Sequence, residues 1–356
     1  MDSNRAQSGF LFILTVLAVA GVLHVTGSVF VPLVIAVLLS FVFSPIISFF
    51  SKRGVPRILS ILLVLLIFLA FSSLVGLVLY SSVQSLVREF PKYQQRISVL
   101  LQDLIIYFDL PEDILNEIQI NRRIGQLLVL VSGNFMSFLS GLIMVIVFLF
   151  FVLLEQPFLH RKLTHALQDQ ATKKITIMLG HINSQIGRYV SVKLLVSFLT
   201  ATIVFTAFSV IGVDFPFIWS VLTFLFNFIP SIGSIVITIL SGSFAVVQFL
   251  PEWNPIIAAV LSMALTQIII GNVLDPQLLG ERLNLSPVVI LLSLLVWGWI
   301  WGVIGMFLAV PITAAIKITL ENVPGVRAIG ILMGTGNYRR RKGDPFPEDD
   351  EGPVET

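Results

Sequence analysis

The residues of this chain that could bind a small solute or an ion are a few polar side chains set in long apolar stretches. Asp275 follows Asn272 closely, and Asn227 and Gln267 also lie in apolar surroundings. An Asp at the centre of a membrane helix costs about 2.5–3.5 kcal/mol to insert, so an ionisable residue there is a functional candidate. Asp275 is therefore a possible Na⁺ or H⁺ ligand. The alternatives are that Asp275 begins a surface turn before Pro276, and that the amides form hydrogen bonds between helices.

Motifs typical of enzymes do not occur in the chain. It has no cysteine, which excludes thiolate nucleophiles and Cys-ligated metal sites, and its four histidines form no HExxH pair. No glycine-rich loop ends in Gly-Lys-Ser/Thr, and Gly242-Ser243 has no histidine in a later apolar run to act as its base. The sequence predicts a protein that is not an enzyme and that holds no metal centre and no cofactor.

The composition is that of a membrane protein. Hydrophobic residues make up 56% of the 356 residues and charged residues only 12%, whereas a soluble domain carries about 25% charged residues. The formal net charge of +2 gives no indication of a nucleic-acid partner.

Long stretches without Asp, Glu, Lys or Arg define the membrane segments. They are 6–51, 58–87, 124–154, 194–213, 215–251, 253–274 and 283–316. A helix needs roughly 20 apolar residues to cross the bilayer, so 6–51 should hold two spans with a bend at His24 to Ser28. The runs are continuously apolar, unlike the alternating strands of a membrane barrel. We expect an all-α integral membrane protein with about eight hydrophobic segments.

The Lys and Arg residues predict the orientation, because basic residues concentrate in cytoplasmic loops. The residues expected on the inner side are Lys52, Arg53, Arg57, Arg161, Lys162, Lys173, Lys174, Arg188, Lys193, Arg327, Arg339, Arg340, Arg341 and Lys342. The short connections 26–28 and 211–216 carry neither Lys nor Arg and are expected outside. Both termini are then cytoplasmic, in a multi-pass protein of the cell (inner) membrane.

Two regions are more polar than the rest. The insertion 88–123 has apolar residues at helical spacing from Ile97 to Phe108, and Asp109-x-x-Glu112 is typical of a second helix start. This lobe should be extracytoplasmic, either docked on the protein's own spans or on lipid headgroups, or acting in substrate gating or subunit contact. We expect residues 1–323 to form one polytopic membrane domain. The charged tail 324–356 should be disordered and cytoplasmic.

The sixth and eighth segments are too long for one straight crossing. At 37 and 34 residues they would span about 55 and 51 Å as helices, against the ~30 Å that is needed. Residues that disrupt helices interrupt each one near its middle: Asn227, Pro230, Ser231 and Gly233, then Gly298, Gly302 and Gly305. We expect broken segments or re-entrant hairpins, which are typical of transporter binding sites. A tip near Gly298 to Gly302 would also explain the mid-run Trp297, Trp299 and Trp301. The alternative for these tryptophans is packing between subunits.

The two broken segments share a plan. Pro216 precedes Gly233 by 17 residues and Pro287 precedes Gly305 by 18, which fits internal repeats. Chance likeness between two apolar segments is the alternative.

Several motifs within 227–311 carry a family resemblance. They are Asn227-Phe-Ile-Pro230-Ser-Ile-Gly233, Asp275-Pro276-Gln277-Leu278-Leu279-Gly280, Leu285-Ser286-Pro287 and Gly305-Met-Phe-Leu-Ala-Val-Pro311. In these motifs, and in the span pattern of about 5–320, the chain resembles the autoinducer-2 exporter family. The resemblance implies a homo-oligomeric bacterial secondary transporter in the membrane lipid that releases a small hydrophilic signalling molecule, while some members are Na⁺/H⁺ antiporters.

Three functions remain open from the sequence. The first is a secondary transporter that exports a small polar molecule, with autoinducer-2 as a candidate substrate. The second is a cation/proton antiporter on the same scaffold, and the third is a membrane scaffold that does not transport. The residues expected along the substrate or ion pathway are Asn227, Pro230, Gly233, Gln267, Asn272, Asp275, Pro276, Gln277, Gly280, Pro287, Gly302, Gly305 and Pro311.

Overall fold

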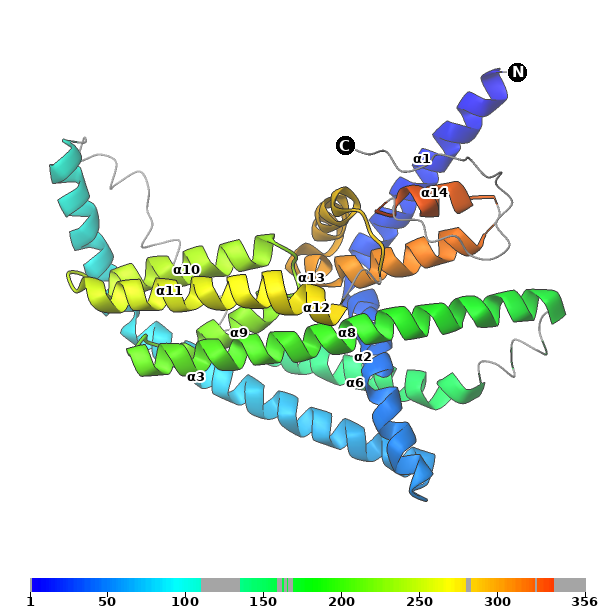
Figure 1. Ribbon diagram of the computed structural model, residues 1–356, viewed down its shortest axis with the longest axis horizontal. Helices are drawn as coiled ribbons and strands as arrows, with labels where there is room; N and C mark the ends of the chain where they lie inside the picture. Colours follow the sequence, from blue (N-terminus) through cyan, green and yellow to red (C-terminus); the bar gives the residue numbers. More distant parts are fainter. Residues whose placement is uncertain are drawn as a thin grey trace, which may run out of the picture.

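The computed structural model describes residues 2–109, 135–158, 162, 165, 169–279, 283–323 and 325–335. Every regular element in these residues is a helix (Figure 1). The helices are α1 (Asp2–Val25), α2 (Gly27–Lys52), α3 (Arg57–Phe108), α6 (Phe135–Glu155), α8 (Asp169–Ile211), α9 (Pro216–Phe226), α10 (Ile232–Phe249), α11 (Trp253–Ile269), α12 (Asp275–Leu279), α13 (Pro287–Asn322) and α14 (Arg327–Leu332). Shorter turns are η1 (Gln156–Phe158) and the π-helix η2 (Ile270–Leu274).

Six of the described helices are long and apolar enough to cross a membrane, and α9 and α11 are shorter apolar helices. The prediction of an all-α membrane protein is confirmed.

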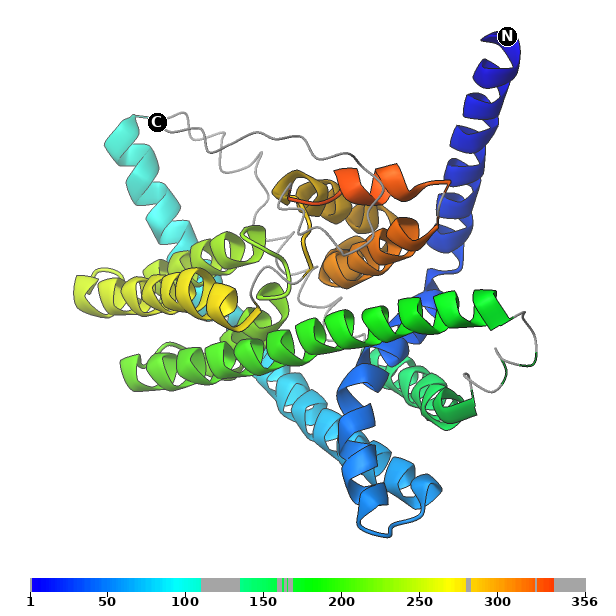
Figure 2. The ribbon, with the colours of Figure 1, turned by 45° about the vertical axis from the view of Figure 1, so that its right-hand side comes forward.

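The junction between α1 and α2 is a bend at Thr26. The Thr26 N–H still donates to the carbonyl of Val22, and the N–H groups of Val29 and Phe30 donate to the carbonyl of Thr26. Figures 1 and 2 show α2 continuing onward from the end of α1 rather than folding back beside it. The sequence correctly indicates an interruption between His24 and Ser28, but the interruption is not the turn of a hairpin.

The polar insertion begins inside a helix. Helix α3 is 52 residues long, contains Pro91 and runs without a break from the third apolar segment to Phe108. The helical spacing predicted over 97–108 is therefore confirmed. Asp109 ends α3 in the left-handed conformation, at φ 50°. The second helix predicted from Asp109-x-x-Glu112 falls, from residue 110 on, outside the described residues.

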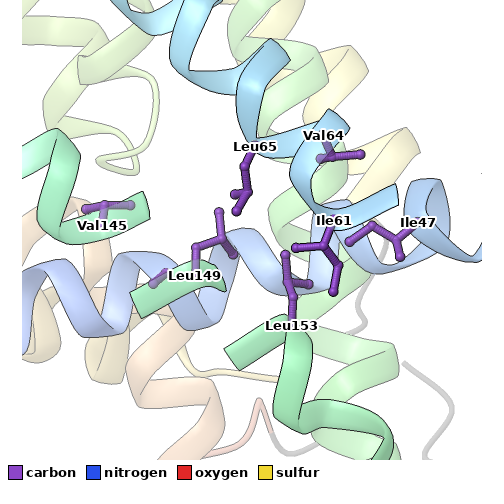
Figure 3. Close-up of a cluster of buried hydrophobic side chains, with 8 residues drawn as sticks. Ile47, Ile61, Val64, Leu65, Val145, Leu149 and Leu153 are labelled. Carbon is purple, nitrogen blue, oxygen red and sulfur yellow. The ribbon is translucent and has the colours of Figure 1, made fainter. Parts of the chain in front are cut away.

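A buried apolar cluster joins α2, α3 and α6 (Figure 3). Ile61, Leu149 and Leu153 have no exposed surface, and Ile47 is 1% exposed. In a bilayer the surrounding lipid is as apolar as these side chains, so close van der Waals packing must hold the helices together. This cluster fixes one side of the framework, while α8 to α13 form the other.

The predicted break of the sixth segment is confirmed, and the segment is a helical hairpin. Its arms are α9 and α10, and its tip is residues 227–231, where Ser231 has φ 59°. At the far end of the arms the rings of Trp219 and Phe244 lie 5.2 Å apart between centroids. The two arms therefore run antiparallel.

The eighth segment is a second hairpin, formed within α13. The helix is interrupted at Trp301 and at Gly302, which has φ 64°. Near this tip a Cβ on Gly298 would lie 2.8 Å from the Met306 Cε. Further along the arms Leu294 and Ala309 belong to one buried cluster, so these arms are also antiparallel.

The two hairpins share one unusual contact. A Cβ on Gly233 would lie 1.8 Å from the carbonyl oxygen of Phe226, and a Cβ on Gly305 would lie 1.8 Å from that of Trp297. Gly233 follows the positive-φ residue Ser231, and Gly305 follows the positive-φ residue Gly302. In both hairpins the start of the second arm therefore packs directly against the backbone of the first arm. This common geometry favours the interpretation of the segments as internal repeats.

We expect Gly233→Ala and Gly305→Ala each to prevent the hairpins from closing, because a methyl group cannot lie 1.8 Å from a carbonyl oxygen. The melting temperature of each variant in detergent should fall clearly below that of the parent. Gly141→Ala in α6 is the control, since its Cβ would meet no atom within 4 Å and Ala is favoured over Gly in a helix by about 0.5–1 kcal/mol. Parental stability of both tip variants would contradict the hairpin geometry.

Candidate functional site

A cavity of about 770 Å³ lies between α8, the first hairpin and α11–α12. Its walls also include residues 283–285, which lead into α13, and Thr335 after α14. Cavities of about 300–1,000 Å³ are typical of small-molecule sites. The cavity adjoins the tip of the α9–α10 hairpin, where Asn227, Pro230 and Ser231 line it.

A buried ion pair lies in the wall of this cavity. The Lys193 Nζ lies 2.6 Å from the Asp275 Oδ2, and the two side chains are only 5% and 17% exposed. The other carboxylate oxygen, Oδ1, is buried and has no hydrogen-bond partner among the described residues. The pair connects the middle part of α8 to the start of α12, across 82 residues of sequence.

The distribution of basic residues counts Lys193 among the residues of the inner loops, but Lys193 lies inside a helix. Helix α8 runs unbroken through Lys193, and no loop ends there. Val190, Ser197 and Thr200 are buried on the same helix, and Lys193 lies at the three- and four-residue spacing between them. That spacing places Lys193 on the face that packs inward, and it was a signal available in the sequence.

The π-helix η2 determines where Asp275 points. The N–H of Asp275 donates to the carbonyl of Ile270, five residues back, so the turn holds one residue more than an α-helical turn. In a regular α-helix Asp275 would lie about 80° around the axis from Gln267, at 100° per residue. The extra residue reduces this offset to about 20°, so the two residues lie on one face, and both line the cavity.

The two other buried polar side chains of the wall differ in their partners. The Asn227 Nδ2 donates to the Ser197 Oγ at 3.0 Å. This is an interhelical hydrogen bond, the alternative role that the sequence leaves open for Asn227. Gln267 is 7% exposed, and neither its Nε2 nor its Oε1 has a partner among the described residues. Within the described helices Gln267 therefore forms no interhelical hydrogen bond of this kind.

The structure brings some of the thirteen predicted pathway residues together and separates others. Those that line the cavity are Asn227, Pro230, Gln267 and Asp275. Gly233 is buried behind the tip, Gln277 is exposed, and Pro287 is the exposed first residue of α13. Gly302 and Gly305 belong to the second tip, and Pro311 is buried beside the cavity-lining Val310. The side chains of Asn272 and Pro276, and all of Gly280, lie outside the described residues.

The second hairpin tip contacts the α1–α2 bend, and it does not line the cavity described here. The Trp301 Nε1 donates to the carbonyl of Leu23 at 2.8 Å, and the His24 Nδ1 lies 2.7 Å from the carbonyl oxygen of Ile300. The predicted tip near Gly298 to Gly302 is confirmed. Its tryptophans serve as an anchor to the N-terminal helices.

The C-terminal chain forms part of the cavity wall. Of the range 324–356, residues 325–335 are described and include α14. The carbonyl of Met333 accepts from the N–H of Ser286 at 2.9 Å, and the N–H of Thr335 donates to the Asn284 Oδ1 at 3.1 Å. These bonds hold the 283–286 segment against the residues that follow α14.

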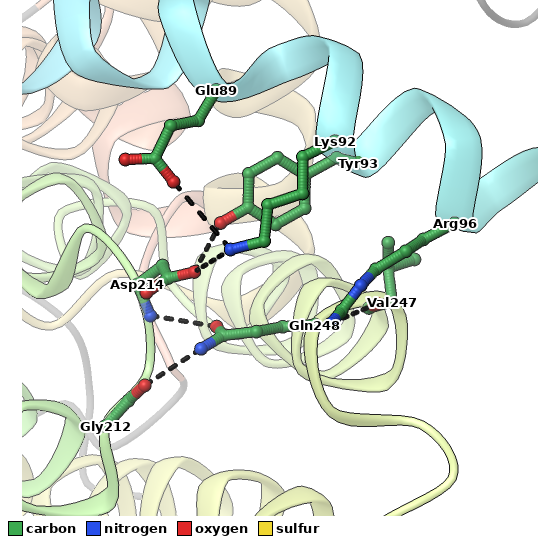
Figure 4. Close-up of polar contacts among 8 residues, drawn as sticks. All are labelled: Glu89, Lys92, Tyr93, Arg96, Gly212, Asp214, Val247 and Gln248. Atoms are coloured by element: carbon green, nitrogen blue, oxygen red, sulfur yellow. Dashed lines mark hydrogen bonds and ion pairs between the residues drawn. The ribbon is translucent and has the colours of Figure 1, made fainter.

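A second polar cluster joins α3 to the connection before α9 and to the last residues of α10 (Figure 4). Asp214, in the α8–α9 connection, accepts a hydrogen bond from the Tyr93 hydroxyl and lies 3.8 Å from the Lys92 Nζ. The Gln248 side chain bonds the N–H of Asp214 and the carbonyl of Gly212, both at 2.8 Å. This cluster fixes the α9–α10 hairpin relative to α3 at the end opposite its tip.

Comparison with known proteins identifies a family. The family described as AI-2E family transporter matches residues 11–325. A protein of Borreliella burgdorferi, named as a transport protein, is 32% identical over 330 residues, which cover 93% of this chain and 91% of that protein. YhhT of Escherichia coli K12, also named as a transport protein, is 31% identical over 92% of this chain and 93% of its own. TqsA of the same strain, named as an AI-2 transport protein, is 28% identical over 87% and 91%. These are names of transport proteins and not of enzymes.

Breaking the ion pair should destabilise the protein more than removing it. Lys193→Met leaves the Asp275 carboxylate buried without its partner, and such a loss costs about 3–5 kcal/mol. The melting temperature in detergent should therefore fall sharply. Lys193→Met with Asp275→Asn removes both charges and should recover most of that loss. A double variant that is no more stable than Lys193→Met alone would contradict the pairing.

Proposed function

The chain belongs to the AI-2E transporter family, and from that premise we propose that it is a secondary transporter that exports a small polar solute through the α8–α12 cavity. Autoinducer-2 is the candidate substrate, because the relative TqsA is named for its transport. The observation that carries the proposal is the buried Lys193–Asp275 pair in the wall of a solute-sized cavity. Ionisable groups inside a membrane protein mark substrate and ion pathways.

The position of the cavity supports this proposal. One of its walls is the break between α9 and α10, and broken helices at membrane depth are tolerated where they line a cavity. A hairpin tip can move as a unit when its arms shift. Such a movement would change which side of the membrane the cavity faces.

A cation/proton antiporter is the second candidate, and it is favoured by the Asp275 Oδ1, which accepts no hydrogen bond from the described residues. The Lys193 ammonium occupies one side of the carboxylate, so a monovalent cation that reached Asp275 would compete with Lys193 for it. Binding of the cation would then break the pair between α8 and α12. This mechanism requires the charge of Asp275, whereas export of a neutral solute without ion coupling does not.

Transport by reconstituted protein separates the two candidates. Proteoliposomes that contain the parent and are loaded with autoinducer-2 should release it. A second set, loaded with radioactive Na⁺, measures the movement of Na⁺. If an ion gradient drives export, Asp275→Asn with Lys193→Met should abolish uphill accumulation yet retain slow downhill exchange. The matched control is Ser262→Ala in α11, whose hydroxyl donates to the carbonyl of Ala259 in its own helix. Movement of Na⁺ against a proton gradient, with no release of autoinducer-2, would reject the exporter in favour of the antiporter.

We place the protein as a homo-oligomer in the cell (inner) membrane with both termini cytoplasmic, and the basic residues support this orientation. A cysteine at Gln102, which is exposed near the end of α3, should react with an impermeant maleimide added to intact cells. A cysteine at Thr172, near the start of α8, should react only after the membrane is opened. The chain has no native cysteine to confuse the result. Labelling of position 172 in intact cells would reverse the orientation.

A further inference from the structure

Gln267 is an anomaly that the fold itself does not explain. The residue is only 7% exposed, and neither polar atom of its amide has a hydrogen-bond partner among the described residues. Native proteins rarely leave buried polar side chains without hydrogen bonds, because their desolvation is then uncompensated. Such a group in a cavity wall is poised for a ligand.

We propose that Gln267 is the specificity-determining residue of this cavity and that, with the Asp275 Oδ1, it selects an uncharged solute bearing neighbouring hydroxyl groups. The inference rests on the proposed transport function and concerns the same cavity. A side-chain amide offers two N–H donors and one acceptor, and an ionised carboxylate oxygen only accepts. One solute hydroxyl can accept from the Gln267 Nε2 while a neighbouring hydroxyl donates to the Asp275 Oδ1.

The geometry allows the two groups to act on one solute. The π-helix η2 brings Asp275 onto the face of Gln267, and both residues line the same cavity. A helix without that extra residue would turn the carboxylate well away from the amide. The backbone distortion therefore has a consequence for recognition, because it makes one two-point site out of two residues eight positions apart.

The charges near this site favour an uncharged solute. Lys193 and Asp275 neutralise each other at 2.6 Å, so the surroundings of Gln267 carry no net charge to compensate a buried ion. Arg188 also lines the cavity but is exposed, where solvent and salt screen its charge. A solute carboxylate would meet the free oxygen of Asp275 and be repelled. A hydroxyl meets an acceptor there.

The test uses ribose and 2-deoxyribose, two uncharged pentoses that differ by one hydroxyl, and ribonate as the anionic probe. Full-length parent in proteoliposomes should exchange radiolabelled ribose at least about tenfold faster than 2-deoxyribose, since a site built to bond a hydroxyl rejects the analogue that lacks it. Ribonate should not be exchanged. Gln267→Met keeps the length of the side chain and should remove the preference for ribose, while Ser262→Ala should keep it.

Gln267→Leu removes both donors and the acceptor, so it too should lose the preference even if the Met variant folds poorly. Equal exchange of both pentoses by the parent, a preference for ribonate, or a Met or Leu variant that still prefers ribose would overturn the inference. Autoinducer-2 release is measured in the same vesicles. Release without discrimination between the pentoses rejects the inference alone, and discrimination without release rejects only the proposed substrate. A parent that moves none of these solutes rejects the proposed function itself.

Discussion

The constraint on which this structure depends is that lipid offers no hydrogen bonds. Any backbone group freed by a helix break must find its partner within the protein or in a water-filled cavity. Both breaks in this chain obey that rule, each in its own way. The first tip lies at a cavity, and the side-chain amide of Asn227 beside it donates a hydrogen bond to the Ser197 hydroxyl of α8. The second tip rests on the bend between α1 and α2, where the carbonyls of Leu23 and Ile300 are paired with Trp301 and His24.

The same hairpin plan therefore serves two purposes. In both hairpins a glycine allows the second arm to pass against the backbone of the first, and a positive-φ residue turns the chain. The residues around the tips differ. The first tip is surrounded by amide, hydroxyl and charged side chains, whereas the second is held by tryptophans, with His24 stacked on Trp299. One tip lies at the cavity, and the other contacts the N-terminal helices.

Length and residue type predicted much of this architecture, because the bilayer sets a fixed span and because Pro and Gly interrupt helices in known ways. Asp275, Gln267 and Asn227 were likewise identifiable as polar residues in apolar surroundings. Lys193 was missed because counting basic residues treats every Lys as a loop marker, although its spacing on α8 showed otherwise. The π-helix could not be predicted, since hydrophobic periodicity over five residues does not separate it from an α-helix. The lack of a partner for Gln267 depends on contacts between distant segments, which one sequence does not reveal.

The Lys193–Asp275 pair is hard to explain by stability alone. A buried ion pair loses much of its attraction to desolvation, and replacing it by apolar residues of similar volume is often neutral or stabilising. In lipid the apolar alternative would be still easier to accommodate, because insertion of either charge is costly. The pair is also incomplete, since one carboxylate oxygen in the cavity wall has no hydrogen-bond partner in the described part of the chain. Two buried charges, one of them only partly satisfied among the described residues, are what the proposed solute or ion site requires.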